Sequence, residues 1–286
     1  MKPDFLVVGH VVQDLHDGEW RAGGAVTYAG LLARNLGLRT AVLTACAEDF
    51  PTEEVLTGID VHRVPSNATT QIRNVYTTEG RKQWVPGRAS PVQIDDLSEG
   101  WAGSSIVLLG PVAGEVDASA IDLFGNSLIG VGVQGWLREI GADGLVTPVA
   151  ANALPERLIS HASAVFVSAE DLPEPRLQST VQGWAEKCDI VALTRGDGGA
   201  DVSYKGEWRH IDAFPARAID PTGAGDVFAA GFLVGLSETS DAWEAARFAA
   251  AGASCVVEGE GPSMVPDRRR VEERLRLYPE IVAKVT

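Results

Sequence analysis

An acid that follows three small residues at the start of an apolar segment carries the clearest chemical signal in this sequence. Residues 218–236 read AIDPTGAGDVFAAGFLVGL, so Asp226 comes directly after Gly223, Ala224 and Gly225. The residues beyond Asp226 leave no polar face, which predicts a helix buried in the interior. The first backbone N–H groups of such a helix have no partner within it, and with the helix dipole they favour an anion such as phosphate.

Asp226 itself could act on a hydroxyl group beside that anion. We expect Thr222 to cap the helix and the helix dipole to keep Asp226 ionised. An ionised carboxylate there could orient and deprotonate a hydroxyl for attack on phosphorus. A purely structural interpretation is also open, with Thr222 as the cap and Asp226 as a dipole-matched acid. The residues alone support the two interpretations equally.

Short apolar runs along the chain predict the sheet that must position this helix. They are continuous rather than alternating, which is typical of parallel strands covered on both faces, and they span residues 5–9, 40–44, 106–110, 127–132, 164–168 and 190–194. Helical patterns separate most of them, over 25–37 with Gly37 as a C-terminal cap, over 173–188 and over 241–257. This alternation predicts an α/β fold with a mostly parallel sheet.

Two segments break the alternation and predict β-hairpins. Residues 61–86 alternate polar and apolar side chains around a turn at Thr78-Glu79-Gly80, so we expect a hairpin that stands apart from the main sheet. Residues 201–211 predict a second hairpin that turns at Lys205-Gly206. Both hairpins could simply extend a sheet edge, whereas the first could instead act as a lid over a site.

The composition excludes several classes of function. The chain has 286 residues, 45% of them hydrophobic, and a formal net charge of −15. That is enough for one large domain, or for one domain with a small appendage, and it offers no basic stripe for nucleic acid or for an anionic membrane. No apolar stretch approaches the ~20 residues of a membrane span. Cys46, Cys188 and Cys255 lack zinc or disulfide spacing, so we expect reduced thiols in a cytoplasmic protein.

Other motifs carry no site. Residues 130–135 fit G-x-G-x-x-G, but Gly141 and Gly144 interrupt the helix that should follow, so we reject a dinucleotide site. There is no G-x-x-x-x-G-K-[ST] loop. The five histidines, His10 among them, lack metal-ligand spacing and are expected to be surface or lightly packed residues.

The segment Asp220–Asp226, DPTGAGD, resembles the D-x-x-G-A-G-D signature of the ribokinase (phosphofructokinase-B) family of carbohydrate kinases. The resemblance extends over nearly the whole chain and is slightly nearer to the inositol-kinase-like branch. It implies a three-layer α/β/α ribokinase-like fold with a mostly parallel central sheet and a small β lid. It also implies a single kinase domain over residues 1–286, with about 61–86 and the 10–22 segment forming the lid.

The resemblance implies a role for each matched residue. The anion hole for the transferring phosphoryl group would comprise Gly223, Ala224 and Gly225, with Asp226 as the catalytic base. The acceptor side would comprise Asp14, Gly23, Gly24, Tyr28 and Arg138. The ATP side would comprise Thr194, Gly196, Gly199 and Thr222, with residues 248–261 completing the adenine pocket. Either Glu170 or Asp171 would serve Mg²⁺, and Asp220 with Thr222 would bind a monovalent cation such as K⁺.

Three departures from the family pattern put a ribose or fructose acceptor in doubt. Tyr28 stands where G-G-x-x-x-N has asparagine, QGWLR at 134–138 keeps only the arginine of D-x-N-x-R, and SAED at 168–171 replaces N-x-x-E. Arg138 is the only basic residue that the motifs place near the acceptor, so we expect a neutral polyol. Tyr28 and Trp136 would form an apolar wall against its ring, although Trp136 could equally belong to the core.

These observations leave three functions open. The leading prediction is an ATP-dependent kinase that phosphorylates a hydroxyl of a small neutral sugar or cyclitol. A nucleoside kinase is the second, and a non-catalytic sugar-sensing protein of the same fold is the third. The intact Asp226 and its small-residue loop argue against the third. The expected partner is a small molecule, with neither nucleic acid nor membrane, and a homodimer through the lid is a candidate assembly.

Overall fold

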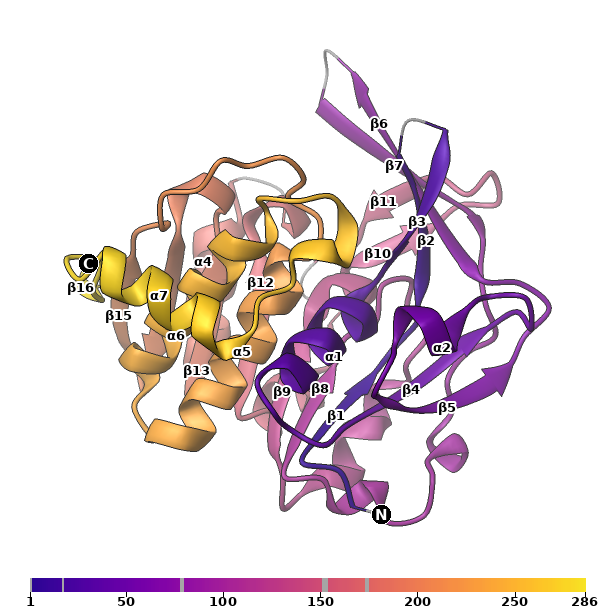
Figure 1. Cartoon of the computed structure of the whole chain (residues 1–286), viewed down its shortest axis with the longest axis horizontal. Helices are drawn as coiled ribbons and strands as arrows, with labels where there is room; N and C mark the ends of the chain where they lie inside the picture. The colour runs from indigo at the N-terminus through magenta and orange to yellow at the C-terminus, as the bar shows by residue number, and fades with distance from the viewer. Residues whose placement is uncertain (1, 17, 78–79, 151–153, 173–174) are drawn as a thin grey trace.

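The computed structural model describes residues 2–16, 18–77, 80–150, 154–172 and 175–286, and a large sheet runs through them (Figure 1). Its parallel strands are β1 (Phe5–Val8), β4 (Thr40–Cys46), β5 (Asp60–Pro65), β8 (Ile106–Leu109), β9 (Leu128–Gly132), β12 (Ala164–Ser168) and β13 (Ile190–Thr194). Antiparallel strands extend one edge: β14 (Ala200–Tyr204), β15 (Glu207–Ile211) and β16 (Lys284–Val285). The order is β16-β15-β14-β13-β12-β9-β8-β1-β4-β5. The six strands predicted from continuous apolar runs are confirmed.

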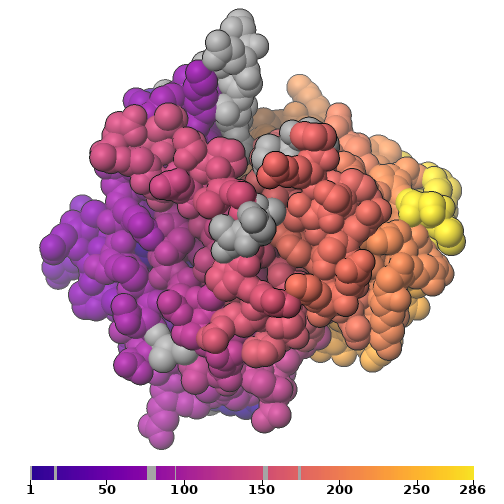
Figure 2. Space-filling model, turned by 180° about the vertical axis from the view of Figure 1, so that it is seen from behind, coloured from indigo at the N-terminus to yellow at the C-terminus, as the bar shows by residue number. Residues whose placement is uncertain are grey.

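Helices cover both faces of this sheet, which confirms a three-layer α/β/α fold. One face carries α1 (Ala25–Asn35), α5 (Ala224–Thr239), α6 (Ala242–Val256) and α7 (Arg268–Leu277). The other carries a 3₁₀ helix (Ala118–Phe124), α3 (Glu156–Ser160) and α4 (Leu177–Ala185). Figure 2 shows this second side, where the pink to red part of the chain spreads across the surface. The helix predicted over 173–188 is α4, and residues 173–174 lie outside the described residues.

The apolar helix α5 is buried because it has neighbours on opposite sides. It packs on β8, β9 and β12 and also against α1 and α6. A β-carbon on Gly130 of β9 would lie 2.6 Å from a methyl carbon of Leu233, so glycine at this position lets α5 approach the sheet. Gly130, the first glycine of the rejected 130–135 motif, thus has a packing role here. On the far side of α5, Gly231 and Gly235 lie against Ala249 and Ala245 of α6.

A second, four-stranded sheet projects from the body (Figure 1). It consists of β2 (Val12–His16), β3 (Glu19–Gly23), β6 (Thr70–Thr77) and β7 (Gly80–Gly87), in the order β3-β2-β6-β7. We call it the lid sheet. A short pair, β10 (Arg138–Ile140) and β11 (Val146–Pro148), lies near it, and α2 (Thr52–Val55) precedes β5.

The predicted hairpin over 61–86 is only partly correct. Residues 60–65 form β5, which pairs with β4 at the edge of the main sheet, and the hairpin itself spans 70–87. An edge strand also has one polar face, so its alternation resembles that of a free hairpin. Thr78 and Glu79 of the predicted turn lie outside the described residues. The other hairpin turns at Lys205 and Gly206, with φ of 52° and 82°, and it extends the main sheet.

Further sequence predictions concern the termini of helices and the thiols. Gly37 follows α1 with φ of 93°, as a glycine cap requires. The three cysteines are buried free thiols. In the part of the chain that the structure describes, no helix is both long enough and apolar enough to cross a membrane.

Candidate active site

The N-terminus of α5 lies against Tyr28 of α1. Gly223 is the N-cap of α5 and has φ of 79°, and a β-carbon on it would lie 2.2–2.5 Å from three atoms of the Tyr28 ring. The prediction that Thr222 caps the helix is wrong, because no side chain caps α5. The Thr222 N–H instead donates to Asp220 Oδ1 at 2.9 Å, within a turn that leads into the helix. Only glycine combines this backbone conformation with this approach to Tyr28.

The loop before Asp226 presents fewer backbone donors than expected. The Ala224 N–H donates to the Pro221 carbonyl oxygen at 3.3 Å, so the turn already uses it. The N–H groups of Gly223 and Gly225 meet no acceptor among the described residues. Donors of this kind at a helix N-terminus are suited to an anion. The predicted anion hole therefore rests on Gly223 and Gly225 more than on Ala224.

Asp226 is surrounded by other carboxylates. Burial raises its pKa to about 7, the charges of Asp14 and Asp171 raise it as well, and Arg138 acts in the opposite direction. The expectation that the helix dipole keeps Asp226 ionised is therefore wrong, because burial and the neighbouring acids outweigh the dipole. A carboxyl group that titrates near neutrality can accept a proton at the pH of the cell.

Asp14 reaches this site from β2 of the lid sheet. Its side chain is buried, and a β-carbon on Gly23 would lie 1.9 Å from Asp14 Oδ2. A β-carbon on Gly24, which has φ of 86°, would lie 2.4 Å from the His10 carbonyl oxygen. The predicted di-glycine is thus explained by geometry, because the Asp14 carboxylate and the chain before β2 occupy the space of both side chains.

The two aromatic residues predicted as a wall lie in different places. Tyr28 is buried beside the site, and burial together with the charges of Asp14, Asp220 and Asp226 raises the pKa of its phenol, which stays neutral. Trp136 belongs to the core on the other face of the sheet, and its Nε1–H donates to the Val116 carbonyl oxygen at 2.9 Å. The core interpretation of Trp136 is therefore the one that the structure supports.

Arg138 and Asp171 lie together beside Asp226. Arg138 Nη2 is 3.9 Å from Asp171 Oδ1, both side chains are more than nine-tenths buried, and Arg138 Nη1 donates to the Val112 carbonyl oxygen at 3.1 Å. Asp171 also accepts from Gln134 Nε2 at 3.2 Å and from the Ser168 N–H at 3.2 Å. Of the two acids left open by the sequence, Asp171 is the one that lies in this cluster.

Glu170, the other candidate acid, is exposed. Among the residues that the structure describes, no cluster of three or more His, Cys, Asp or Glu side chains is arranged to hold a metal ion. Mg²⁺, however, is usually held by one or two carboxylates together with phosphate oxygens of the substrate. One buried carboxylate, that of Asp171, fits this donor set.

The loop predicted for the nucleotide joins β13 to β14. Thr194 ends β13, and its hydroxyl donates to the Val167 carbonyl oxygen at 3.4 Å. Gly196 and Gly199 have φ of 58° and 80°, and a β-carbon on Gly199 would lie 2.1 Å from the Ile211 carbonyl oxygen. These glycines are required by the tight turn at the C-terminal end of a parallel strand.

Asp220 connects the start of α5 with residues 259–264. Its Oδ1 accepts the Thr222 N–H, and its Oδ2 accepts the Gly261 N–H at 3.0 Å. The predicted adenine segment, 248–261, therefore ends next to the candidate active site. Because both oxygens already accept backbone hydrogen bonds, the Asp220 carboxylate has a clear structural role in addition to the predicted cation role.

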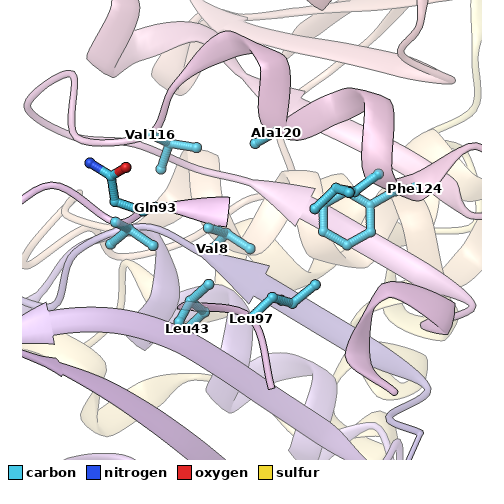
Figure 3. Close-up of a pocket in the computed structure, with 9 residues that line it drawn as sticks. Val8, Leu43, Gln93, Leu97, Val116, Ala120 and Phe124 are labelled. Atoms are coloured by element: carbon cyan, nitrogen blue, oxygen red, sulfur yellow. The ribbon is translucent and has the colours of Figure 1, made fainter. Parts of the chain in front are cut away.

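Neither of two hollows in the structure is lined by Asp14, Arg138 or Asp226. One holds only about 10 Å³ among apolar side chains such as Val8, Leu43 and Phe124 (Figure 3). The other, of about 540 Å³, lies between Arg21, Arg34 and the 260–263 loop. The first is too small for a sugar. An ion pair between Arg21 and Glu260, at 2.9 Å, lies at the second.

Two buried polar residues near Asp14 were not found from the sequence. His10 is fully buried, so its expected surface or lightly packed position is wrong, and Glu115 is buried beside it. Neither residue lies in a motif. A charged residue within the apolar segment GPVAGEV was the only signal that could have drawn attention to Glu115.

The chain is similar to several known kinases. Residues 139–268 match the family described as pfkB family carbohydrate kinase. A cytidine kinase from Thermococcus kodakarensis is 26% identical over 82% of this chain and 88% of that protein. A nucleoside kinase from Methanothermobacter thermautotrophicus is 26% identical over 95% of each chain. An inositol 3-kinase from Zea mays is 36% identical in a shorter segment, 37% of this chain and 27% of that protein.

Solved structures of the same fold cover nearly the whole chain. A pyrophosphate-dependent kinase in the ribokinase family, in complex with a pyrophosphate analogue and myo-inositol, superposes with a TM-score of 0.80 at 22% identity, over 94% of this chain and 99% of that one. Arabidopsis thaliana ribokinase in complex with ribose and ATP gives a TM-score of 0.74 at 21% identity, over 96% and 99%. The whole chain therefore has the fold of ribokinase-family kinases, and residues 139–268 are similar to the pfkB family of carbohydrate kinases.

Proposed function

We propose that this kinase transfers the terminal phosphoryl group of ATP to a hydroxyl of a small neutral sugar or cyclitol. The observation that carries the proposal is the start of α5, where backbone donors for an anion adjoin a carboxyl group with a pKa of about 7. Phosphoryl transfer needs little covalent chemistry from the protein, and positioning with charge stabilisation supplies most of the catalysis. This site offers both.

Each charged side chain has a distinct part in the proposed reaction. Asp14 accepts hydrogen bonds from hydroxyl groups of the acceptor, and ionised Asp226 takes the proton of the attacking hydroxyl. The Gly223 and Gly225 N–H groups hold the transferring phosphoryl group, and Arg138 offsets part of the negative charge. Asp171 would hold Mg²⁺, which neutralises charge on the phosphates. The lid sheet, which carries Asp14, would exclude water from the reaction.

A neutral acceptor follows from the charges around Asp226. Asp14 and Asp171 both raise the pKa of Asp226, and Arg138 is already shared between Asp171 and the Val112 carbonyl oxygen. A sugar phosphate would bring further negative charge to this cluster, where Arg138, the basic side chain that acts on Asp226, is already engaged. The similarity to an inositol 3-kinase favours a cyclitol.

A nucleoside acceptor is the second candidate, and one specific observation favours it. A cytidine kinase and a nucleoside kinase are similar to this chain over most of its length. A neutral ribose ring with two neighbouring hydroxyls suits Asp14 as well as a cyclitol does.

On the donor side, ATP would occupy the Thr194–Gly199 loop and the 248–261 segment. Asp220 and Thr222 would lie next to a K⁺ ion, and the buried free thiols suit a cytoplasmic enzyme.

A coupled kinase assay with purified protein tests the proposal. ATP and pyrophosphate serve as alternative donors with Mg²⁺, and the acceptors are myo-inositol, ribose, fructose, cytidine, adenosine and fructose 6-phosphate. We expect turnover with ATP, abolished by EDTA, on at least one neutral acceptor. Preference for the sugar phosphate would contradict the charge argument. Absence of turnover with every pair would favour the non-catalytic sugar-sensing alternative.

Asp14→Ala should weaken use of the acceptor. A hydrogen bond from a hydroxyl to a charged group contributes about 1.5–3 kcal/mol, so we expect kcat/KM for the acceptor to fall at least about tenfold. The KM for ATP should change much less, because Asp14 lies on the lid side of Asp226. Steady-state kinetics with each substrate varied in turn measures both. Equal losses for donor and acceptor would place Asp14 outside the acceptor site.

A further inference from the structure

A buried His–Glu pair lies where the lid sheet joins the body, and the proposed mechanism does not use it. The His10 and Glu115 side chains are both 0% exposed, with His10 Nδ1 and Glu115 Oε1 4.0 Å apart. Burial of a carboxylate costs several kcal/mol unless its oxygens accept hydrogen bonds. The partners of this pair therefore indicate what it contributes.

Glu115 binds two separate backbone segments. Its Oε1 accepts the His10 N–H at 2.8 Å, in the crossover from β1 to β2. Both oxygens accept the Val112 N–H, at 3.0 and 3.1 Å, and Oε2 accepts the Ala113 N–H at 2.7 Å. The carboxylate thus holds the crossover that precedes β2 against the loop that follows β8.

The His10 side chain contacts the chain at two further places, next to β7 and at the start of β6 of the lid sheet. Its Nε2 lies 2.8 Å from the Ser90 carbonyl oxygen, just after β7, and its Nδ1 lies 2.7 Å from Thr70 Oγ1, at the start of β6. A carbonyl oxygen only accepts, so Nε2 donates to Ser90, and Nδ1 shares a hydrogen bond with the Thr70 hydroxyl. Thr70 Oγ1 in turn accepts the Ala89 N–H at 3.0 Å. One hydrogen-bond network therefore joins the chain before β2, the start of β6 and the chain after β7, where the polypeptide enters or leaves the lid sheet.

Both segments held by Glu115 lead directly to the candidate active site. Asp14 lies four residues beyond His10 on β2, and its carboxylate faces Gly23. Val112, whose N–H Glu115 accepts, offers its own carbonyl oxygen to Arg138. Asp14 and Arg138, two of the side chains that act on Asp226, are thus each linked through the backbone to one buried carboxylate.

We propose that Glu115 is a positioning residue for the acceptor site, and that with His10 it fixes Asp14 and Arg138 relative to Asp226. The proposal rests on the proposed kinase function. It predicts a specific defect, since an error of about 1 Å in the place of a reacting group can cost about a hundredfold in rate. The KM for the acceptor should rise, whereas the KM for ATP should change little.

The test compares Glu115→Gln with Asp117→Asn. In the first variant a side-chain amide replaces the carboxylate and places N–H donors against backbone N–H donors. Asp117 is an exposed cap of the 3₁₀ helix, a role that asparagine also fills. We expect Glu115→Gln to raise the acceptor KM at least about tenfold and the ATP KM less than about twofold, with Asp117→Asn unchanged. Equal acceptor KM values in Glu115→Gln and the wild type would overturn the proposal, even if thermal stability falls.

A second pair of variants covers the case in which Glu115→Gln does not fold. Thr70→Val removes the hydroxyl that binds His10, and Thr70→Ser keeps it. We expect a rise of a few fold in acceptor KM for Thr70→Val and near-normal kinetics for Thr70→Ser. If both variants have the acceptor KM of the wild type, the hydrogen bond between His10 and Thr70 has no kinetic role and the proposal fails.

Hydrogen exchange separates this proposal from the proposed function. If the wild type turns over none of the acceptors, the kinase proposal fails, but the exchange of Glu115→Gln can still be measured. Faster exchange confined to residues 10–15 and 111–113 would support the positioning role. Exchange that is unchanged, or faster throughout the chain, would contradict it.

Discussion

Asp226→Asn should abolish phosphoryl transfer while the protein remains folded. An amide cannot take the proton of the attacking hydroxyl, so we expect kcat to fall by more than about a hundredfold. The Kd for ATP should change little, because the proposed ATP site lies at the Thr194–Gly199 loop. Asp241→Asn is the matched control, since Asp241 caps the start of α6 and asparagine caps equally well. A wild-type kcat in Asp226→Asn would exclude Asp226 as the base.

The pH dependence of kcat/KM in the wild type should report the titration of Asp226. Because the pKa of Asp226 is raised to about 7, kcat/KM should rise with pH to a plateau above neutrality and fall about tenfold per unit in the acid range. A profile that is flat between about pH 5 and 8 would show that Asp226 titrates elsewhere or takes no proton.

The raised pKa of Asp226 also predicts that Asp226→Asn stabilises the fold. An acid whose pKa is higher in the folded than in the unfolded state favours folding when protonated, and it loses that advantage as pH rises towards the folded value. Between the usual pKa of 3.8 and about 7, wild-type Asp226 therefore becomes progressively destabilising. At about pH 8 Asp226→Asn should unfold at a higher temperature than the wild type, by up to about 4 kcal/mol in free energy. The difference should disappear below about pH 4, and equal unfolding temperatures at both pH values would contradict the shift.

Gly223→Ala should be the most damaging conservative change in the site. The new β-carbon would lie 2.2–2.5 Å from three ring atoms of Tyr28, and φ of 79° is strained for alanine. Either the start of α5 or Tyr28 must move, and both line the place proposed for phosphoryl transfer. We expect kcat/KM to fall at least about a hundredfold, and thermal stability to fall as well.

Two other glycines make this result interpretable. Gly183 in α4 has open space around its missing β-carbon, so Gly183→Ala should leave activity unchanged and slightly stabilise the helix. Gly225→Ala meets no neighbour within 4 Å and should fold normally. Near-wild-type kcat/KM in Gly223→Ala, measured beside these two, would mean that the Tyr28 contact does not shape the site.

Local sequence patterns determined most of the fold and pointed to the reactive stretch. Continuous apolar runs predicted the six strands and helical patterns predicted α1, α4 and α6, because burial on both faces and helical periodicity are properties of neighbouring residues. The DPTGAGD segment before an apolar helix predicted the start of α5 for the same reason. Asp14, Tyr28 and Arg138 were found only through the resemblance, since no local pattern relates them to Asp226.

Only the tertiary structure decided what depends on distant parts of the chain. Alternation in residues 61–65 could not tell an edge strand from a free hairpin, because both expose one face. The cap of α5 depended on Asp220, which takes the Thr222 N–H, and on Tyr28, which requires glycine at 223. The pKa of Asp226 depended on burial and on Asp14 and Asp171, which are far away in sequence. Desolvation and Coulomb forces act through space, so these properties exist only once the chain has brought β2, α5 and the end of β12 together.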